Sequence, residues 1–164
     1  MRIAIGAVGQ LKRGPEADLI SDYLTRASGL GRTMGLKGPE IQEYEAAKGL
    51  DGARRMDAEA DLLTRPIAPG DRVFVLDERG KALTSRQMAG EIERNLNDGA
   101  PALWCLIGGA DGHGAAVNQL VSDGRAKRLS FGPATWPHML VRVMLAEQLY
   151  RAVTILAGHP YHRD

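Results

Sequence analysis

The stretch from Trp104 to Gly114 reads WCLIGGADGHG and joins two kinds of sequence. Its first residues are apolar and suit a buried strand, whereas its last seven include four glycines and suit a loop. A strand that passes through such a loop into a helix is the unit from which parallel α/β sheets are built. This stretch therefore predicts an α/β protein.

The sequence on both sides alternates strand and helix patterns in the same way. The expected strands are Arg2–Val8, Ile41–Ala46, Arg72–Asp77, Ala102–Ile107 and Lys127–Phe131, of which Ile41–Ala46 is expected at a sheet edge. The expected helices begin at Pro15, near Ala53, at the capping box Thr84–Gln87, near Ala115 and at Pro137. The glycine-rich residues 28–38 are expected to form a mobile loop. Together these elements predict one domain over residues 1–164, with a mostly parallel sheet and helices on both faces.

Composition restricts the class of protein without identifying its function. The chain has 164 residues, of which 44% are hydrophobic and 25% are charged, as is ordinary for a globular protein. A formal net charge of +1 neither requires nor excludes a nucleic-acid partner, because binding depends on a local basic patch. No apolar run approaches the roughly 20 residues of a membrane span, so we expect a cytoplasmic protein without a membrane partner.

Cysteine and histidine usage argues against a metal site. The single Cys105 excludes an intramolecular disulfide, and the four histidines do not have the spacing of a structural zinc site. Cys105 lies within an apolar run, which favours a small buried side chain over a reactive thiol. We therefore expect no metal.

The glycine loop does not match the common phosphate-binding motifs. Its glycines at 109, 112 and 114 are spaced G-x-x-G-x-G, the reverse of the dinucleotide fingerprint, and the loop lacks the Gly-Lys-Ser/Thr ending of a P-loop. Two interpretations stay open from the loop alone: a turn that holds no ligand, and a backbone-lined pocket for a flat, largely apolar cofactor. His113, between two glycines, is expected at the surface of the loop.

Three strand ends followed by glycine are expected to meet in one crevice. They are Leu76–Asp77 before Gly80, Ile107 before Gly108, and Phe131 before Gly132. In open parallel sheets, ligands bind outside the carboxyl ends of the strands. The predicted ligand site therefore lies among these three loops.

The final helix carries an arginine on its apolar face. At helical spacing, Arg142 falls on the same side as Ala146, Leu149 and Val153, with His138 one turn earlier. A buried arginine requires an anionic or polar partner. One hypothesis makes His138 a helix cap and Arg142 an intersubunit salt bridge, and the other directs both side chains into the crevice.

The C-terminal residues are richer in functional groups than a simple chain end. Residues 158–164, GHPYHRD, include Tyr161, His162 and Arg163, which are able to handle a proton, stack on a base or hold a phosphate. The plainer alternative is a disordered, solvated end.

Four motifs taken together resemble the RlmH family of SPOUT-class methyltransferases. They are LDERGK (76–81), LIGGADG (106–112), LSFGPATWPHMLVRVMLAEQLYRA (129–152) and HPYHR (159–163). Members of that family methylate N3 of a pseudouridine in bacterial large-subunit (23S) ribosomal RNA. The resemblance implies a homodimer and a C-terminal trefoil knot. Because a chain of 164 residues has no obvious RNA-binding module, we expect it to act on the assembled ribosome.

The resemblance also implies a cofactor and a set of site residues. S-adenosylmethionine is expected among the three loops, against Leu76, Gly108, Phe131, Gly132, Pro133, Ala134, Thr135 and Trp136. The candidates for proton removal and for stabilising the uracil-like ring are His138, Arg142, Tyr161 and His162. The residues expected at the RNA are Arg142, Tyr161, His162 and Arg163, with the tail of one subunit completing the pocket of the other.

Three alternatives remain from the sequence. The first is a non-catalytic ribosome-binding or RNA-binding protein of the same fold. The second is a nucleotide-dependent α/β enzyme of another class, which the reversed glycine spacing disfavours. The third is a SPOUT enzyme for another substrate, such as transfer RNA.

Overall fold

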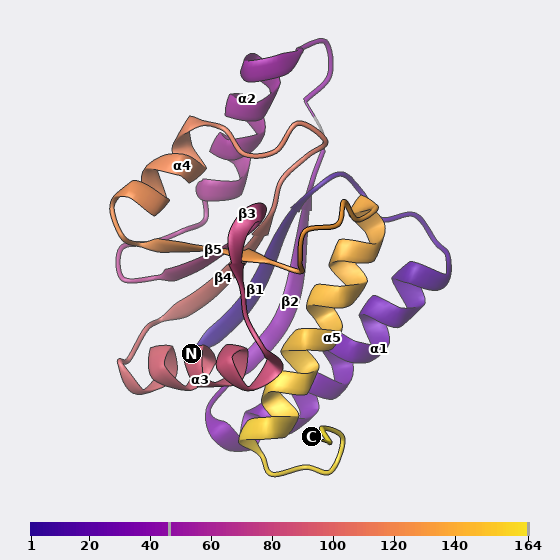
Figure 1. Ribbon diagram of the computed structural model, residues 1–164, viewed down its shortest axis with the longest axis vertical. Coiled ribbons are helices and arrows are strands. Elements are labelled where there is room, and N and C mark those ends of the chain that lie inside the picture. Colours follow the sequence, from indigo (N-terminus) through magenta and orange to yellow (C-terminus); the bar gives the residue numbers. More distant parts are fainter. Residues whose placement is uncertain (46, 164) are drawn as a thin grey trace.

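The structure, a computed structural model, describes residues 1–45 and 47–163 and contains one five-stranded sheet. The strands are β1 (Arg2–Val8), β2 (Lys37–Tyr44), β3 (Arg72–Ala82), β4 (Ala102–Ile107) and β5 (Ala126–Ser130). They lie in the order β2-β1-β4-β3-β5, and every neighbouring pair is parallel (Figure 1). The predicted parallel α/β sheet is confirmed, and β2 is an edge strand as expected. The expected end of that strand at Ala46 lies outside the described residues.

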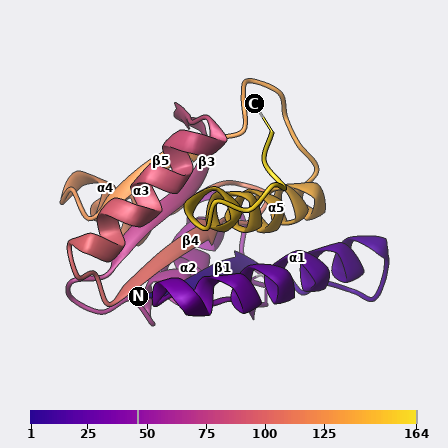
Figure 2. The same cartoon turned by 90° about the horizontal axis from the view of Figure 1, so that it is seen from below.

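Helices cover both faces of the sheet. They are α1 (Pro15–Gly31), α2 (Gly52–Thr64), α3 (Ser85–Asn97), α4 (Ala115–Ser122) and α5 (His138–Leu156). The helices α1, α3 and α5 pack on one face, where α1 and α5 run side by side, and α2 and α4 pack on the other (Figures 1 and 2). Within the described ranges, no helix has the length and apolarity needed to cross a membrane.

The two faces of the inner strands explain their continuous apolar sequence. On β1, Ile3 and Ile5 belong to the core formed with α1, α3 and α5, whereas Ala4 and Val8 belong to the core formed with α2 and α4. On β4, Trp104 and Cys105 divide between the two cores in the same way. Strands buried on both faces do not alternate between apolar and polar residues. Cys105 is accordingly a buried thiol, and burial raises its pKa to about 12.

The expected mobile loop over residues 28–38 is wrong. Helix α1 continues to Gly31, a short 3-10 helix covers Arg32–Met34, and β2 begins at Lys37. A Cβ atom on Gly31 would lie 3.2 Å from the Cβ of Leu36 and 3.9 Å from Val153 on α5. Glycine is therefore used here for close packing between α1, α5 and the start of β2.

The long strand β3 contacts β5 at two separate places. Leu76 pairs with Leu129, and so does Lys81, so residues 77–80 of β3 have no paired residue in β5. Asp77 and Arg79 lie in this irregular segment and line the cavity at the carboxyl ends of the strands. β3 consequently runs to Ala82 and does not stop at Asp77 as predicted. The trefoil knot stays a prediction.

Candidate active site

The three predicted loops meet at one cavity of about 380 Å³. Three segments line it: residues 76–79 of β3, residues 107–113 at the end of β4 and in the loop that follows, and residues 129–136 without Pro133 at the end of β5 and in the loop that follows. His138 and Val141 of α5 complete the lining. Of the residues expected to hold the cofactor, Leu76, Gly108, Phe131, Gly132, Ala134, Thr135 and Trp136 line the cavity, and Pro133 does not. The ends of three parallel strands thus form the pocket wall, as the sheet topology requires.

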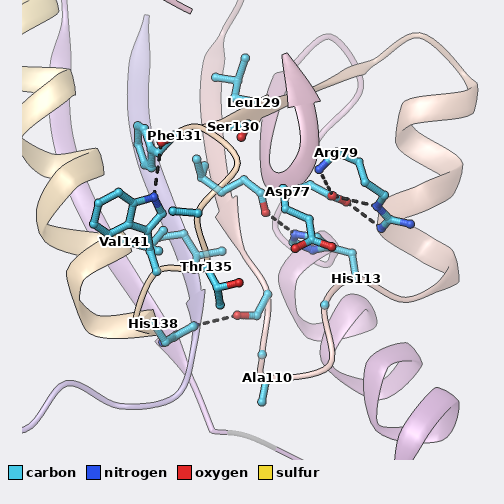
Figure 3. Close-up of a pocket in the computed structure, with 18 of the residues that line it drawn as sticks. Asp77, Arg79, Ala110, His113, Leu129, Ser130, Phe131, Thr135, His138 and Val141 are labelled. Carbon is cyan, nitrogen blue, oxygen red and sulfur yellow. Dashed lines mark hydrogen bonds and ion pairs between the residues drawn. The ribbon is translucent and has the colours of Figure 1, made fainter. Parts of the chain in front are cut away.

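The sides of the cavity differ in chemistry. Figure 3 shows Phe131, Val141 and His138 on one side and Asp77, Arg79 and His113 on the other. Apolar side chains and backbone groups form much of the wall, whereas the Asp77 carboxylate is paired with Arg79 and Arg128. Such a wall suits a flat ligand with an apolar body and a few hydrogen-bonding atoms.

Glycine at position 108 is required by the packing of the loop itself. A Cβ atom there would lie 2.5 Å from the carbonyl oxygen of Gly112 and 3.0 Å from Cε1 of His113. The loop turns back on itself through a hydrogen bond from the Gly112 amide to the Gly109 carbonyl, with an N–O distance of 3.2 Å. Only a residue without a side chain leaves room for this turn.

His138 lies at the start of α5 and holds the same loop from the other side. Its Nε2 is 2.7 Å from the Gly108 carbonyl oxygen, and because a carbonyl only accepts, Nε2 carries the hydrogen. Nδ1 therefore has a free lone pair in the neutral ring. Burial lowers the pKa of His138, and nearby Arg142 lowers it further, although the hydrogen bond to Gly108 and the charge of Glu59 oppose the shift. The ring is consequently neutral at pH 7.

His113 is not at the loop surface, contrary to the prediction. Its side chain is buried, and Nε2 donates to the Leu76 carbonyl oxygen at 2.8 Å, which links the loop after β4 to β3. Its Nδ1 atom is covered and has no hydrogen-bond partner. Burial lowers the pKa of His113, so this ring is also neutral at pH 7.

Asp77 is a pocket residue that site reasoning from the sequence missed. Two guanidinium nitrogens of Arg79 lie 3.0 and 2.9 Å from its carboxylate, and Nε of Arg128 lies 3.2 Å away. Burial by itself raises the pKa of Asp77, but the hydrogen bonds from Arg79 and the charge of Arg128 hold it below its ordinary value. Asp77 lies within the motif LDERGK, so its place in that motif and at a strand end was the sequence signal that could have identified it.

Arg142 has neither of the two predicted orientations. It is fully buried, and its guanidinium donates to Glu43 Oε1 on β2 at 2.6 Å and to the carbonyl oxygens of Val8 and Gly9 at 2.6 and 2.7 Å. The anionic partner expected on energetic grounds therefore comes from the same chain. Arg142 does not line the cavity and joins α5 to the end of β1.

Tyr161 and His162 pack against α5 and do not line the cavity of their own chain. The Tyr161 hydroxyl donates to Glu147 at 3.1 Å, and its ring lies 4.6 Å from that of Tyr150. His162 contributes to a second groove that also contacts residues 129–132. Residues 129–132 therefore lie between this groove and the cavity, and Arg163 is exposed to solvent.

No group of three histidine, cysteine or acidic side chains in residues 1–45 and 47–163 is arranged to hold a metal ion. The polar groups at the cavity include two histidines whose pKa is lowered by burial and the Asp77 carboxylate, whose charge Arg79 and Arg128 balance. The arrangement offers a proton acceptor, Nδ1 of His138, beside a backbone-lined pocket.

Comparisons with known proteins agree with this architecture. A family model described as a predicted SPOUT methyltransferase matches residues 1–162. Proteins named ribosomal RNA large subunit methyltransferase H are similar along their whole length: 49% identity in Paracoccus denitrificans and 43% in Methylocella silvestris, each covering 100% of both chains, and 49% in Cereibacter sphaeroides over 99% of both. The chain belongs to the SPOUT methyltransferase family, in the group of ribosomal RNA large subunit methyltransferases H that its sequence motifs resembled.

Proposed function

We propose that this protein transfers a methyl group from S-adenosylmethionine to N3 of a pseudouridine in large-subunit ribosomal RNA. The main support for this proposal is that three strand-end loops line one cavity of about 380 Å³ in a chain of this methyltransferase family. The volume lies within the range of about 300 to 1,000 Å³ that is usual for small-molecule sites. The RNA substrate also implies a cytoplasmic protein.

The residues of the cavity fit the proposed cofactor. Leu76, Gly108 and the segment from Phe131 to Trp136 would hold the adenosine part by apolar contact and backbone hydrogen bonds. The unpartnered Nδ1 of His113 adds a buried acceptor in the same wall. When bound, the cofactor supplies an electrophilic methyl group on a positively charged sulfur. The sulfur leaves as a neutral thioether, so the reaction needs no metal.

We assign proton removal from N3 to His138. Its ring is neutral, Nε2 is held by the Gly108 carbonyl, and the lone pair on Nδ1 is able to accept a proton. Tyr161 is less suited, because burial, Tyr23 and Glu147 raise the pKa of its phenol to about 12. The phenol keeps its proton at neutral pH and serves as a contact group.

We propose that the protein works as a homodimer in which the tail of one subunit reaches the RNA beside the cavity of its partner. In one chain, none of Tyr161, His162 and Arg163 lines the cavity, and His162 lines the second groove together with residues 129–132. Large apolar side chains remain exposed near this region: Leu19 of α1 at 46%, Leu140 of α5 at 41% and Trp136 at 42%. A second subunit would cover them.

Ribosomal RNA recognition in this proposal depends on the assembled ribosome. We propose that the chain is a single methyltransferase domain without a separate RNA-binding module, which the match of the methyltransferase family model over residues 1–162 supports. Arg142, which was expected at the RNA, is occupied by Glu43 and two carbonyls, so we assign it the role of positioning α5.

The test is methyl transfer to ribosomes that lack the modification. Glutamine at position 138 is able to donate to the Gly108 carbonyl but not to accept the N3 proton, so His138→Gln should retain cofactor binding and lose about 10²- to 10⁴-fold in rate. Mass spectrometry of the RNA identifies the methylated nucleoside. Wild-type protein that binds no S-adenosylmethionine at millimolar concentration would favour the non-catalytic RNA-binding alternative.

A mixing experiment tests the shared site. One subunit lacks residues 160–164 and keeps His138, and the other carries His138→Gln with an intact tail. In a mixed dimer, the first subunit's cavity receives the second subunit's tail, so activity returns although each parent is inactive. If the tail acts only within its own chain, the mixture stays inactive.

A further inference from the structure

Helix α2 holds the glycine loop from behind, although none of its residues lines the cavity. Nε of Arg55 donates to Asp111 at 2.6 Å, and Asp57 accepts from the Ala115 amide at 2.7 Å. Glu59 is the third contact, because a Cβ atom on Gly109 would overlap its carboxylate. The loop is therefore held between α2 on one side and His138 on the other.

The Glu59 side chain is buried without a cation. The residue is 3% exposed, Oε1 accepts from the Ala47 amide at 3.2 Å, and the covered Oε2 has no hydrogen-bond partner. In the part of the chain that the structure describes, no lysine, arginine or histidine forms an ion pair with it. Burying such a group without a partner is costly, so an orphaned acceptor beside a pocket is an indication of function.

The aspartates near the loop differ from Glu59, and Asp57, which has no ion pair among the described residues, is exposed to solvent. Asp77 is paired with Arg79 and Arg128, and Asp111 is paired with Arg55. Among the carboxylates that contact the glycine loop, Glu59 is thus the one that is buried and, in the described residues, has no cationic side chain beside it.

Gly109 brings the Glu59 carboxylate close to the cavity. Gly109 lines the cavity and has no side chain to hold a ligand away from the carboxylate. The charge of Glu59 also reaches across the loop, since it raises the pKa of His138 against the effect of burial. A positive charge bound in the cavity would be attracted to the same carboxylate.

We propose that Glu59 is the counter-charge for a cationic ligand in the cavity and makes the site prefer a sulfonium over a neutral thioether. The inference rests on the proposed function and deepens it. In methyl transfer, a bond forms between N3 and the methyl carbon, and the electron pair of the broken carbon–sulfur bond stays on sulfur. The sulfur loses its positive charge, so Glu59 strengthens binding of the substrate cofactor and not of the product.

The experiment compares three ligands by calorimetry: S-adenosylmethionine, neutral S-adenosylhomocysteine, and sinefungin, which carries an ammonium-bearing carbon in place of the sulfonium. Glu59→Gln should weaken both cationic ligands about tenfold and leave the neutral one nearly unchanged, the size expected for unit charges roughly 10 Å apart at an effective dielectric of about 20. Asp61→Asn, which removes an exposed charge from the same helix, should change none of the three. Glu59→Asp keeps the charge and should keep the preference.

The outcomes separate this inference from the proposed function. Wild-type protein that binds none of the three ligands overturns the proposed function. Equal weakening of all three by Glu59→Gln means that Glu59 only shapes the loop, and the counter-charge role is then wrong. If circular dichroism shows that Glu59→Gln is unfolded, the affinities of the wild-type protein provide the test. Wild-type protein that binds S-adenosylhomocysteine as tightly as the two cationic ligands would contradict the proposal.

Discussion

Replacing Arg142 with alanine should lower the free energy of unfolding of the protein. The substitution removes three hydrogen bonds, to Glu43 and to the carbonyls of Val8 and Gly9, at a residue that is fully buried. Breaking a buried ion pair by removing one partner costs about 3 to 5 kcal/mol. For a chain of this size, that loss lowers the melting temperature by about 6 to 20 °C.

Urea unfolding followed by circular dichroism measures this change, at several protein concentrations because a dimer is stabilised by mass action. Glu43→Gln and the double variant complete a cycle, in which we expect a coupling of about 2 kcal/mol between the two side chains. Glu43 also accepts from the Leu11 amide at 2.9 Å, so its own replacement disturbs the loop after β1 as well.

The reasoning would be refuted by an Arg142→Ala protein that unfolds within about 1 kcal/mol of the wild type and yet has lost ribosomal RNA methylation. Such a result would mean that Arg142 acts on the RNA in the working enzyme. If the variant instead dissociates from a dimer to monomers with little change in the stability of each subunit, the hypothesis of an intersubunit salt bridge would be supported.

Two further substitutions test the cavity wall. Gly108→Ala would put a methyl group 2.5 Å from the Gly112 carbonyl oxygen, so cofactor affinity measured by calorimetry should fall at least about tenfold. Gly90→Ala on α3 meets open space and should leave affinity unchanged, and equal affinity in both variants would contradict the assignment of the loop. Burial lowers the pKa of His113 below 6.5, so the unfolded chain takes up a proton first and the wild type loses stability as the pH falls from 7 toward 5. His113→Gln should lose less stability over this interval, with exposed His159→Gln behaving like the wild type; an unchanged pH slope in His113→Gln would count against a buried neutral ring.

Local sequence patterns were sufficient for the order and type of the main elements. The capping box at Thr84 is formed as predicted, with the Gln87 amide donating to the threonine hydroxyl, and β4 has the predicted bounds. These features depend on a few neighbouring residues and on apolar runs. The glycines of residues 28–38 were misread, because Gly31 serves a contact with Val153, which lies far along the chain.

The candidate site was predictable as a set of loops but not as a set of contacts. Residues such as Leu76 and Gly108 follow strand ends, and parallel strands bring such ends together. The partner of Arg142 was not predictable, since Glu43 lies on the edge strand 99 positions earlier and no local pattern links the two. His113 was misjudged for a similar reason: its burial depends on the Leu76 carbonyl of another strand.

The strand order has a consequence for how the chain is made. β1 pairs with β2 on one side and with β4 on the other, so the first pairing can form as soon as residues 1–44 have been synthesised. The opposite edge of β1 then waits for the roughly 60 residues between Tyr44 and β4, a delay of about 3 to 12 s at ordinary rates of synthesis. During that interval the apolar strand RIAIGAV presents an open edge to other chains. Aggregation of nascent protein, and the help of chaperones against it, should therefore centre on the first 44 residues.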